Sequence, residues 1–138
     1  MDESNTGGRN EGLIGKRVSR PNAKRLVAGR GRYSDDIQLP RMVHVAFARS
    51  PHPHARILSI DKTAAVGADG VVAVLTGNDL ASMCTPWTGG AAHIPALRSP
   101  EQHAMAVDIV RWQGEPVVAV VATSRALAED AVEMLAID

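Results

Sequence analysis

The sequence is most informative between residues 29 and 61, where it reads GRGRYSDDIQLPRMVHVAFARSPHPHARILSID. Residues 42–49 alternate, because Val43, Val45 and Phe47 face one way and the residues between them face the other way. A period of two predicts a strand that is buried on one face and partly buried on the other. This strand is the first element of the fold that the residues define.

A rigid turn and further elements follow this strand. Two prolines within residues 50–54 remove backbone donors and favour extended conformations before them, and residues 55–60 then predict a second strand. Beyond them the pattern predicts strands at 71–75, 107–112 and 117–122, a helical turn at 22–26, and helical segments at 62–66, 76–83 and 125–135. A strand has only begun at residues 136–138, which favours a domain truncated at its carboxyl end. The order of elements predicts an α+β fold with a small mixed sheet and two to three helices.

The periodicity fails between residues 84 and 106, which we expect to form a long irregular loop of the kind that compact domains keep for a purpose. Trp87 lies in its Pro- and Gly-rich part. A large ring there either plugs a local satellite core or stands on a surface that another body covers. Both interpretations stay open at this point.

The composition is typical of one globular domain. The chain has 138 residues, of which 45% are hydrophobic and only 3% aromatic, so the core must be built from Val, Ala, Leu and Ile, with few rings to fill a deep pocket. Residues 1–12 are polar and Gly-rich, which predicts a disordered tail. We expect the domain to span residues 13–138.

The charge is unevenly distributed, although the net charge is zero. Residues 1–32 carry eight basic against three acidic side chains, and the remainder carries seven against twelve. A basic arm on an acidic body suggests docking against an acidic surface, or simple solubility. Nucleic-acid binding is an alternative use of the arm, but Tyr33 is the only aromatic residue near it and offers no stacking platform.

Several functional classes are disfavoured by the residues. Cys84 is the only cysteine, which excludes an internal disulfide and an iron–sulfur cluster held by this chain alone. Ser34 stands where a dinucleotide-binding loop starting at Gly29 would need its third glycine. His52 and His54 point to opposite sides of an extended segment, which disfavours a metal site.

Catalysis and membrane insertion also lack support. Cys84, His93 and His103 are close in sequence, but no nucleophile elbow accompanies them. No apolar run approaches the ~20 residues that cross a bilayer. Because the polar start lacks the order of a secretory signal, we expect a cytoplasmic protein.

An ordered set of motifs resembles one enzyme family. The set comprises GRGRYSDD (29–36), LP (39–40), RSPHPHARI (49–57), SID (59–61), GVVAVLTG (70–77), GEPVVAVVA (114–122) and ALAEDA (126–131). In this order they are similar to the α/β hammerhead domain that opens the large subunit of molybdenum hydroxylases, namely xanthine dehydrogenase, aldehyde oxidase and aerobic carbon monoxide dehydrogenase. The likeness covers roughly residues 13–138.

The resemblance implies the chemistry of a complete enzyme. Such an enzyme hydroxylates a carbon centre with oxygen from water, at molybdenum held by molybdopterin cytosine dinucleotide, and passes electrons through [2Fe–2S] centres to FAD. The implied partners are the remaining molybdenum-binding large chain, the iron–sulfur and FAD subunits, and a small-molecule substrate. The cofactor loops and the general base lie beyond the hammerhead domain in the family, so we assign this chain no catalytic residue, no metal ligand and no cofactor of its own.

The resemblance assigns residues of this chain only to contacts around the active site, and none to catalysis. In the family the hammerhead domain packs on the molybdenum domains and borders the substrate funnel, and Trp87, His93 and Ile94 are the candidates for that border here. Arg20, Arg30 and Arg32 of the basic arm are candidates for an inter-subunit contact. We therefore expect the hammerhead portion or a small subunit of such a hydroxylase. The alternatives are a free-standing, non-catalytic binding module of the same fold and a nucleic-acid-associated protein.

Overall fold

The computed structural model describes residues 14–90, 94 and 96–138. The expected tail, residues 1–12, and His93 lie outside the described residues. The chain divides into two compact units, Met1–Gln38 and Leu39–Asp138. Within the described residues, no helix combines the length and the apolar content that crossing a membrane requires.

The described residues of the first unit, 14–38, hold two short helices. Helix α1 (Ala23–Val27) confirms the predicted helical turn, and η1 (Ser34–Asp36) is a 3-10 turn. Gly29 has a φ of +68°, which a residue without a side chain adopts at no steric cost. The turn at η1 is closed by the Tyr33 N–H, which donates to Asp36 Oδ2 at 2.9 Å. The basic arm thus contains defined local structure rather than extended chain alone.

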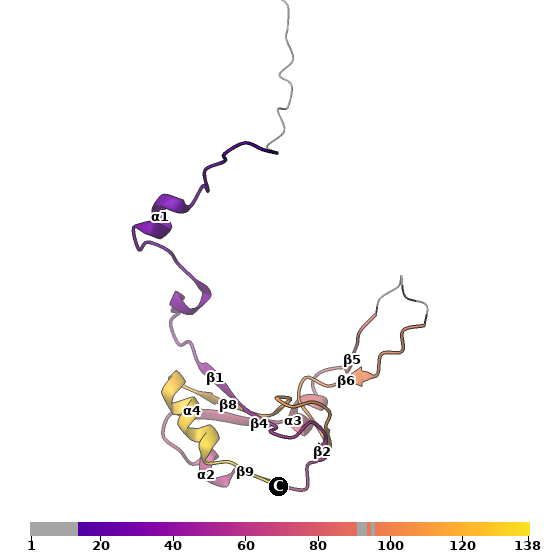
Figure 1. The fold of residues 1–138 in the computed structure, drawn as a ribbon. Helices are drawn as coiled ribbons and strands as arrows, with labels where there is room; N and C mark the ends of the chain where they lie inside the picture. The colour runs from indigo at the N-terminus through magenta and orange to yellow at the C-terminus, as the bar shows by residue number, and fades with distance from the viewer. Residues whose placement is uncertain (1–13, 91–93, 95) are drawn as a thin grey trace, which may run out of the picture. The chain divides into compact units, whose positions relative to one another are not determined.

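The second unit contains nine strands and three α-helices among its described residues (Figure 1). The strands are β1 (His44–Arg49), β2 (Ala55–Arg56), β3 (Ile60–Asp61), β4 (Val71–Thr76), β5 (Trp87–Thr88), β6 (Glu101–Gln102), β7 (Ile109–Val110), β8 (Pro116–Ala122) and β9 (Ala136–Ile137). The helices are α2 (Thr63–Val66), α3 (Gly77–Ala81) and α4 (Arg125–Glu133). The α+β class is confirmed. With α1, four α-helices are described, where two to three were expected.

The main sheet has the order β1-β8-β4, with β8 in the middle. All its ladders, and the three two-stranded ladders β2-β7, β3-β9 and β5-β6, are antiparallel, so the expectation of a mixed sheet is wrong for the described residues. Strand direction depends on which distant segments pair, and alternation within one strand carries no information on its partner.

Two predicted elements differ in extent. The strand expected at residues 55–60 is interrupted, because β2 pairs with β7 whereas β3 pairs with β9. At this change of partner the Ile57 N–H donates to the Asp108 carbonyl and the Leu58 N–H donates to the Asp138 carbonyl. Within the segment expected to be irregular throughout, β5 and β6 form a short ladder. Each difference arises from long-range pairing.

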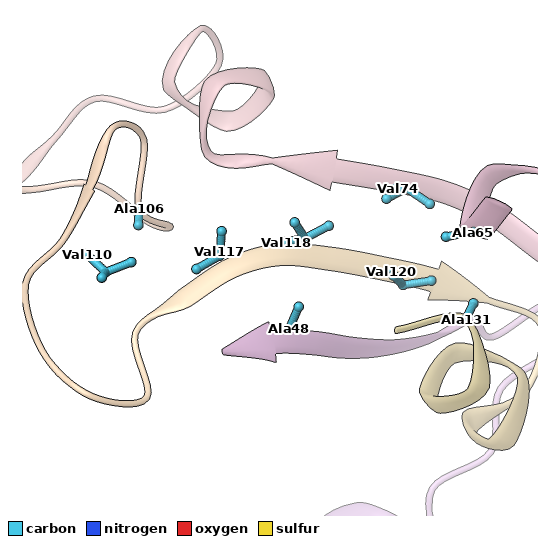
Figure 2. Close-up of a cluster of buried hydrophobic side chains, with 9 residues drawn as sticks. All are labelled: Ala48, Ala65, Val74, Ala106, Val110, Val117, Val118, Val120 and Ala131. Carbon is cyan, nitrogen blue, oxygen red and sulfur yellow. The ribbon is translucent and has the colours of Figure 1, made fainter. Parts of the chain in front are cut away.

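One face of the main sheet carries the core. Side chains from all three strands meet α2 and α4 there, and their small size lets the helices approach closely (Figure 2). The buried cluster comprises Ala48, Ala65, Val74, Ala106, Val110, Val117, Val118, Val120 and Ala131. The buried cluster thus consists of Val and Ala, whereas Leu and Ile, which were also expected in the core, are only partly buried against it, as Ile57, Ile60 and Leu135.

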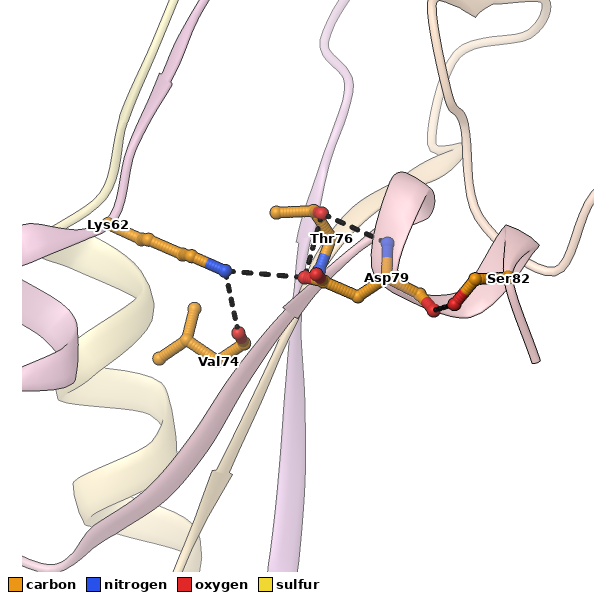
Figure 3. A network of polar contacts seen from close by, with 5 residues as sticks. All are labelled: Lys62, Val74, Thr76, Asp79 and Ser82. Atoms are coloured by element: carbon orange, nitrogen blue, oxygen red, sulfur yellow. Dashed lines mark hydrogen bonds and ion pairs between the residues drawn. The ribbon is translucent and has the colours of Figure 1, made fainter.

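A polar network fixes the junction between β4 and α3 (Figure 3). The Thr76 N–H and hydroxyl both donate to Asp79 Oδ2 at 2.8 Å, and Lys62 Nζ lies 3.3 Å from the same oxygen. Lys62 Nζ also donates to the Val74 carbonyl at 3.2 Å. The hydrogen bonds from Thr76, with a smaller contribution from Lys62, lower the pKa of Asp79.

Replacing Thr76 by valine is expected to destabilise the chain by about 1 kcal/mol, because the N-cap oxygen of α3 is lost while the shape is kept. The pKa of Asp79 should rise toward its ordinary value, since one of its donors disappears. In the unmodified chain the lowered pKa stabilises the fold above the pKa of an unfolded aspartate, and this contribution is lost as the pH falls through the folded value. Urea unfolding and a carboxyl titration by NMR measure both effects. An unchanged Asp79 titration would contradict this account.

Candidate functional site

The β5-β6 ladder, together with the described residues just before it and between its strands, forms the candidate site, which we call the Trp87 ribbon (residues 83–90, 94 and 96–102). Trp87 pairs with Gln102 and Thr88 pairs with Glu101. The Gly89 N–H donates to Ser99 Oγ at 3.1 Å and ties the two sides together beyond the ladder. A Cβ atom on Gly89 would lie 3.1 Å from the Trp87 ring, so the glycine lets the ring lie against the backbone.

The Trp87 side chain is 62% exposed, so it does not plug a local core. The other interpretation, a surface that another body covers, stays a prediction. Ile94 lies in the same ribbon and is also exposed, whereas His93 is outside the described residues. The structure therefore brings Trp87 and Ile94 into one segment and leaves both in contact with solvent.

Further apolar side chains of the ribbon are exposed. Met83 and Leu97 share this property with Trp87 and Ile94. Exposed apolar side chains gathered in one segment are typical of a surface that meets another protein or an apolar ligand. Trp87 and Ile94 were predicted from the sequence. Met83 and Leu97 were not, although the failure of periodicity after residue 84 could have indicated Leu97.

The arginines proposed for an inter-subunit contact lie in the first unit. Arg20, Arg30 and Arg32 are all exposed. The backbone around them is ordered by local hydrogen bonds, because the Ala23 N–H donates to the Arg20 carbonyl at 3.0 Å and the Arg30 N–H donates to the Arg25 carbonyl at 2.9 Å. Their exposure makes them accessible to a partner, and their contact role stays a prediction.

The described residues do not bring together any group of three His, Cys, Asp or Glu side chains that could hold a metal ion. His52, His54 and Cys84 are each exposed.

Two turns that are far apart in the sequence, one at Ser50 and one at Gly114 and Glu115, are hydrogen-bonded to each other. The Ser50 N–H donates to the Glu115 carbonyl at 3.0 Å, and the Gly114 N–H donates to the Ser50 carbonyl at 2.8 Å. Glu115 is only 3% exposed, and its carboxylate accepts from the Arg111 N–H. The first of these turns borders a cavity of about 200 Å³ whose lining includes Arg49, His52, Arg56, Ile57, Val110 and Asp138. The two prolines of residues 50–54 indicate the first turn in the sequence. Nothing in the sequence indicates that this turn pairs with the one at Gly114 and Glu115.

The comparisons with known proteins agree with this architecture. Residues 28–138 match the family model described as "Aldehyde oxidase and xanthine dehydrogenase, a/b hammerhead domain". The nicotine 6-hydroxylase large subunit of Paenarthrobacter nicotinovorans is 42% identical over 91% of this chain and 15% of its own length. The carbon monoxide dehydrogenase large chain of Afipia carboxidovorans is 40% identical over 83% of this chain and 13% of its own length.

Solved structures give the same result. Quinoline 2-oxidoreductase from Pseudomonas putida 86 superimposes with a TM-score of 0.82 at 40% identity, over 88% of this chain and 15% of that one. The Cu,Mo-CO dehydrogenase superimposes with a TM-score of 0.75 at 38% identity, over 90% of this chain and 15% of that one.

The fold and its motifs therefore define a hammerhead domain of the molybdenum hydroxylase class. The chain belongs to the aldehyde oxidase and xanthine dehydrogenase family, and its hammerhead domain includes residues 28–138. The chain spans 13–15% of the length of the four relatives just named. The start of the domain at residue 13 stays a prediction.

Proposed function

We propose that this chain is the hammerhead portion or small subunit of a molybdopterin-dependent hydroxylase, and that it is not catalytic on its own. Its role is structural: it packs on the molybdenum-binding region and borders the substrate funnel with the Trp87 ribbon. The observation that carries the proposal is the match of residues 28–138 to the hammerhead family model. The chain spans 15% of the length of the nicotine 6-hydroxylase large subunit. A cytoplasmic location stays a prediction of the sequence.

The partners would be the remaining molybdenum-binding large chain and the iron–sulfur and FAD subunits. Together they would supply molybdopterin cytosine dinucleotide, [2Fe–2S] centres and FAD. Support comes from the names of the relatives, which are a large subunit, a large chain and a subunit of a dehydrogenase complex. When bound in the remaining region, the molybdenum would supply hydroxylation of a carbon centre with oxygen from water. The exposed arginines Arg20, Arg30 and Arg32 would contact a neighbouring subunit.

Purification from the native host tests the proposal. We expect the chain to elute in an assembly far larger than 14.6 kDa that contains molybdenum and iron. A metal-free species near 14.6 kDa would overturn the proposal and favour the free-standing binding module. Binding to nucleic acid that weakens steeply with added salt would instead favour the nucleic-acid-associated alternative.

Replacing Trp87 by alanine tests the funnel role within this assembly. We expect KM to rise about tenfold with the molybdenum content unchanged, because loss of an aromatic contact of roughly 1.4 kcal/mol corresponds to that factor. Nicotine, quinoline and carbon monoxide, the compounds in the relatives' names, are the substrates to assay.

Trp112→Ala is the matched control, since Trp112 is the other tryptophan and is also exposed, at 43%. Its KM should stay within about twofold of the unmodified assembly. Equal changes for the two variants, or a KM unaffected by Trp87→Ala, would contradict a role of the ribbon at the substrate entrance.

A further inference from the structure

The main sheet has a second face, opposite the core. The register pairs Val45 with Val121 and Phe47 with Ala119, and it pairs the same two residues of β8 with Ala73 and Leu75 of β4. Successive side chains of a strand alternate between faces, so these positions share one face, while Ala48, Val74, Val118 and Val120 lie on the face with α2 and α4. The second face, which we call the open face, consists of Val45, Phe47, Ala73, Leu75, Ala119 and Val121.

The open face is apolar and, along β1, solvent-exposed. Val45 is 50% exposed and Phe47 is 42% exposed, although both lie within β1 and pair with the central strand β8. Val43, two residues before Val45, is also exposed. Among the described residues of the second unit, the helices that pack on this sheet, α2 and α4, contribute Ala65 and Ala131 to the opposite face (Figures 1 and 2). No charged residue occurs among the six positions.

We propose that the open face is the surface that binds the remaining molybdenum-binding region of the subunit, through an apolar patch on that region. This inference rests on the proposed function and adds the contact surface. In the relatives, the part that matches this chain makes up 13–15% of the large chain. Each hammerhead domain there is therefore accompanied by one much larger region, which is the expected occupant of this face. Its patch is expected to be mainly apolar, because Val45 and Phe47 offer no hydrogen-bond partner to a buried polar group. A charged group does border this face, since the Arg49 guanidinium lies 5.4 Å from the centre of the Phe47 ring.

The size of the face disfavours a second copy of this chain as the occupant. Three strands about 4.8 Å apart and six residues long at about 3.3 Å each present roughly 300 Å². Two such faces would bury about 600 Å², whereas stable interfaces bury about 1,200–2,000 Å² in total. The remaining region makes up most of the large chain in the relatives, so it has the surface to extend the contact beyond the open face.

Thiol accessibility in the intact assembly tests the inference. Val45→Cys places a thiol on the open face, and Val66→Cys places a thiol on α2, where Val66 is 56% exposed. Both variants are made in the native host, and the rate of maleimide labelling of each peptide is measured by mass spectrometry. We expect labelling at position 45 to be at least tenfold slower than at position 66 in the assembly, and the two rates to be equal after denaturation. Val43→Cys gives a second measurement just before β1, should Val45→Cys disturb the strand.

The outcomes separate this inference from the proposed function. A molybdenum-containing assembly with slow labelling at positions 45 and 43 supports both. Equal labelling at positions 45 and 66 in a molybdenum-containing assembly overturns the inference and leaves the proposed function standing. Oxidative cross-links that join position 45 of two copies also overturn it, because a second copy would then cover the face. A metal-free species near 14.6 kDa overturns both.

Discussion

Gly77→Ala is expected to destabilise the chain by about 3 kcal/mol or more, at the upper end of what overpacking costs. Gly77 is the first residue of α3 and is buried. A Cβ atom there would lie 1.9 Å from the carbonyl oxygen and 2.6 Å from the carbonyl carbon of Ala106. These are backbone atoms, so the clash can be relieved only by moving the chain around Ala106. That segment is itself buried, because Met105 and Ala106 are 2% and 1% exposed.

Gly67→Ala is the matched control for this variant. Gly67 ends α2 with ordinary helical φ and ψ, and the nearest atoms to an added Cβ lie 3.7 Å away. An alanine there should be neutral or stabilise the chain by up to about 1 kcal/mol, because it reduces the freedom of the unfolded chain. Urea unfolding of the two variants measures the difference. Similar stabilities would show that the segment around Ala106 moves without cost.

Val120→Asp is expected to prevent folding, with a loss of at least about 4 kcal/mol. Val120 is fully buried in β8, between Ala46 of β1 and Val74 of β4. Its side chain lies in the same buried cluster as Ala65 and Ala131 of the two covering helices (Figure 2). A carboxylate placed among these methyl groups would lose its hydration and find no partner.

Val72→Asp is the control for Val120→Asp, since Val72 lies in β4 and is 60% exposed. Its carboxylate stays hydrated, and the cost should be below about 1 kcal/mol. Circular dichroism and urea unfolding distinguish a folded from an unfolded chain. A cooperative transition for Val120→Asp close to that of the unmodified chain would contradict the assignment of the core face.

The two surfaces proposed for contact differ in how far the sequence indicates them. The failure of periodicity after residue 84 is a local property, and it is enough to point to the segment that contains Trp87. The sequence does not predict the open face. The alternation of residues 42–49 predicts that the strand has two faces, but it does not indicate which of them the helices cover. The register of β1 on β8, together with the positions of α2 and α4, is needed to choose between them.

The amino-acid sequence by itself determined the local elements and the family. Apolar alternation, Pro- and Gly-containing turns and capping residues are local properties, and they placed the longer strands and helices within a few residues of their bounds. The ordered motifs carried the family resemblance for the same reason. Only the tertiary structure decided the antiparallel order β1-β8-β4, the interruption between β2 and β3, and which sheet face stays open. Each of these depends on pairing between residues that are far apart in the chain. The register of that pairing is set by packing between different segments, so no single segment determines it.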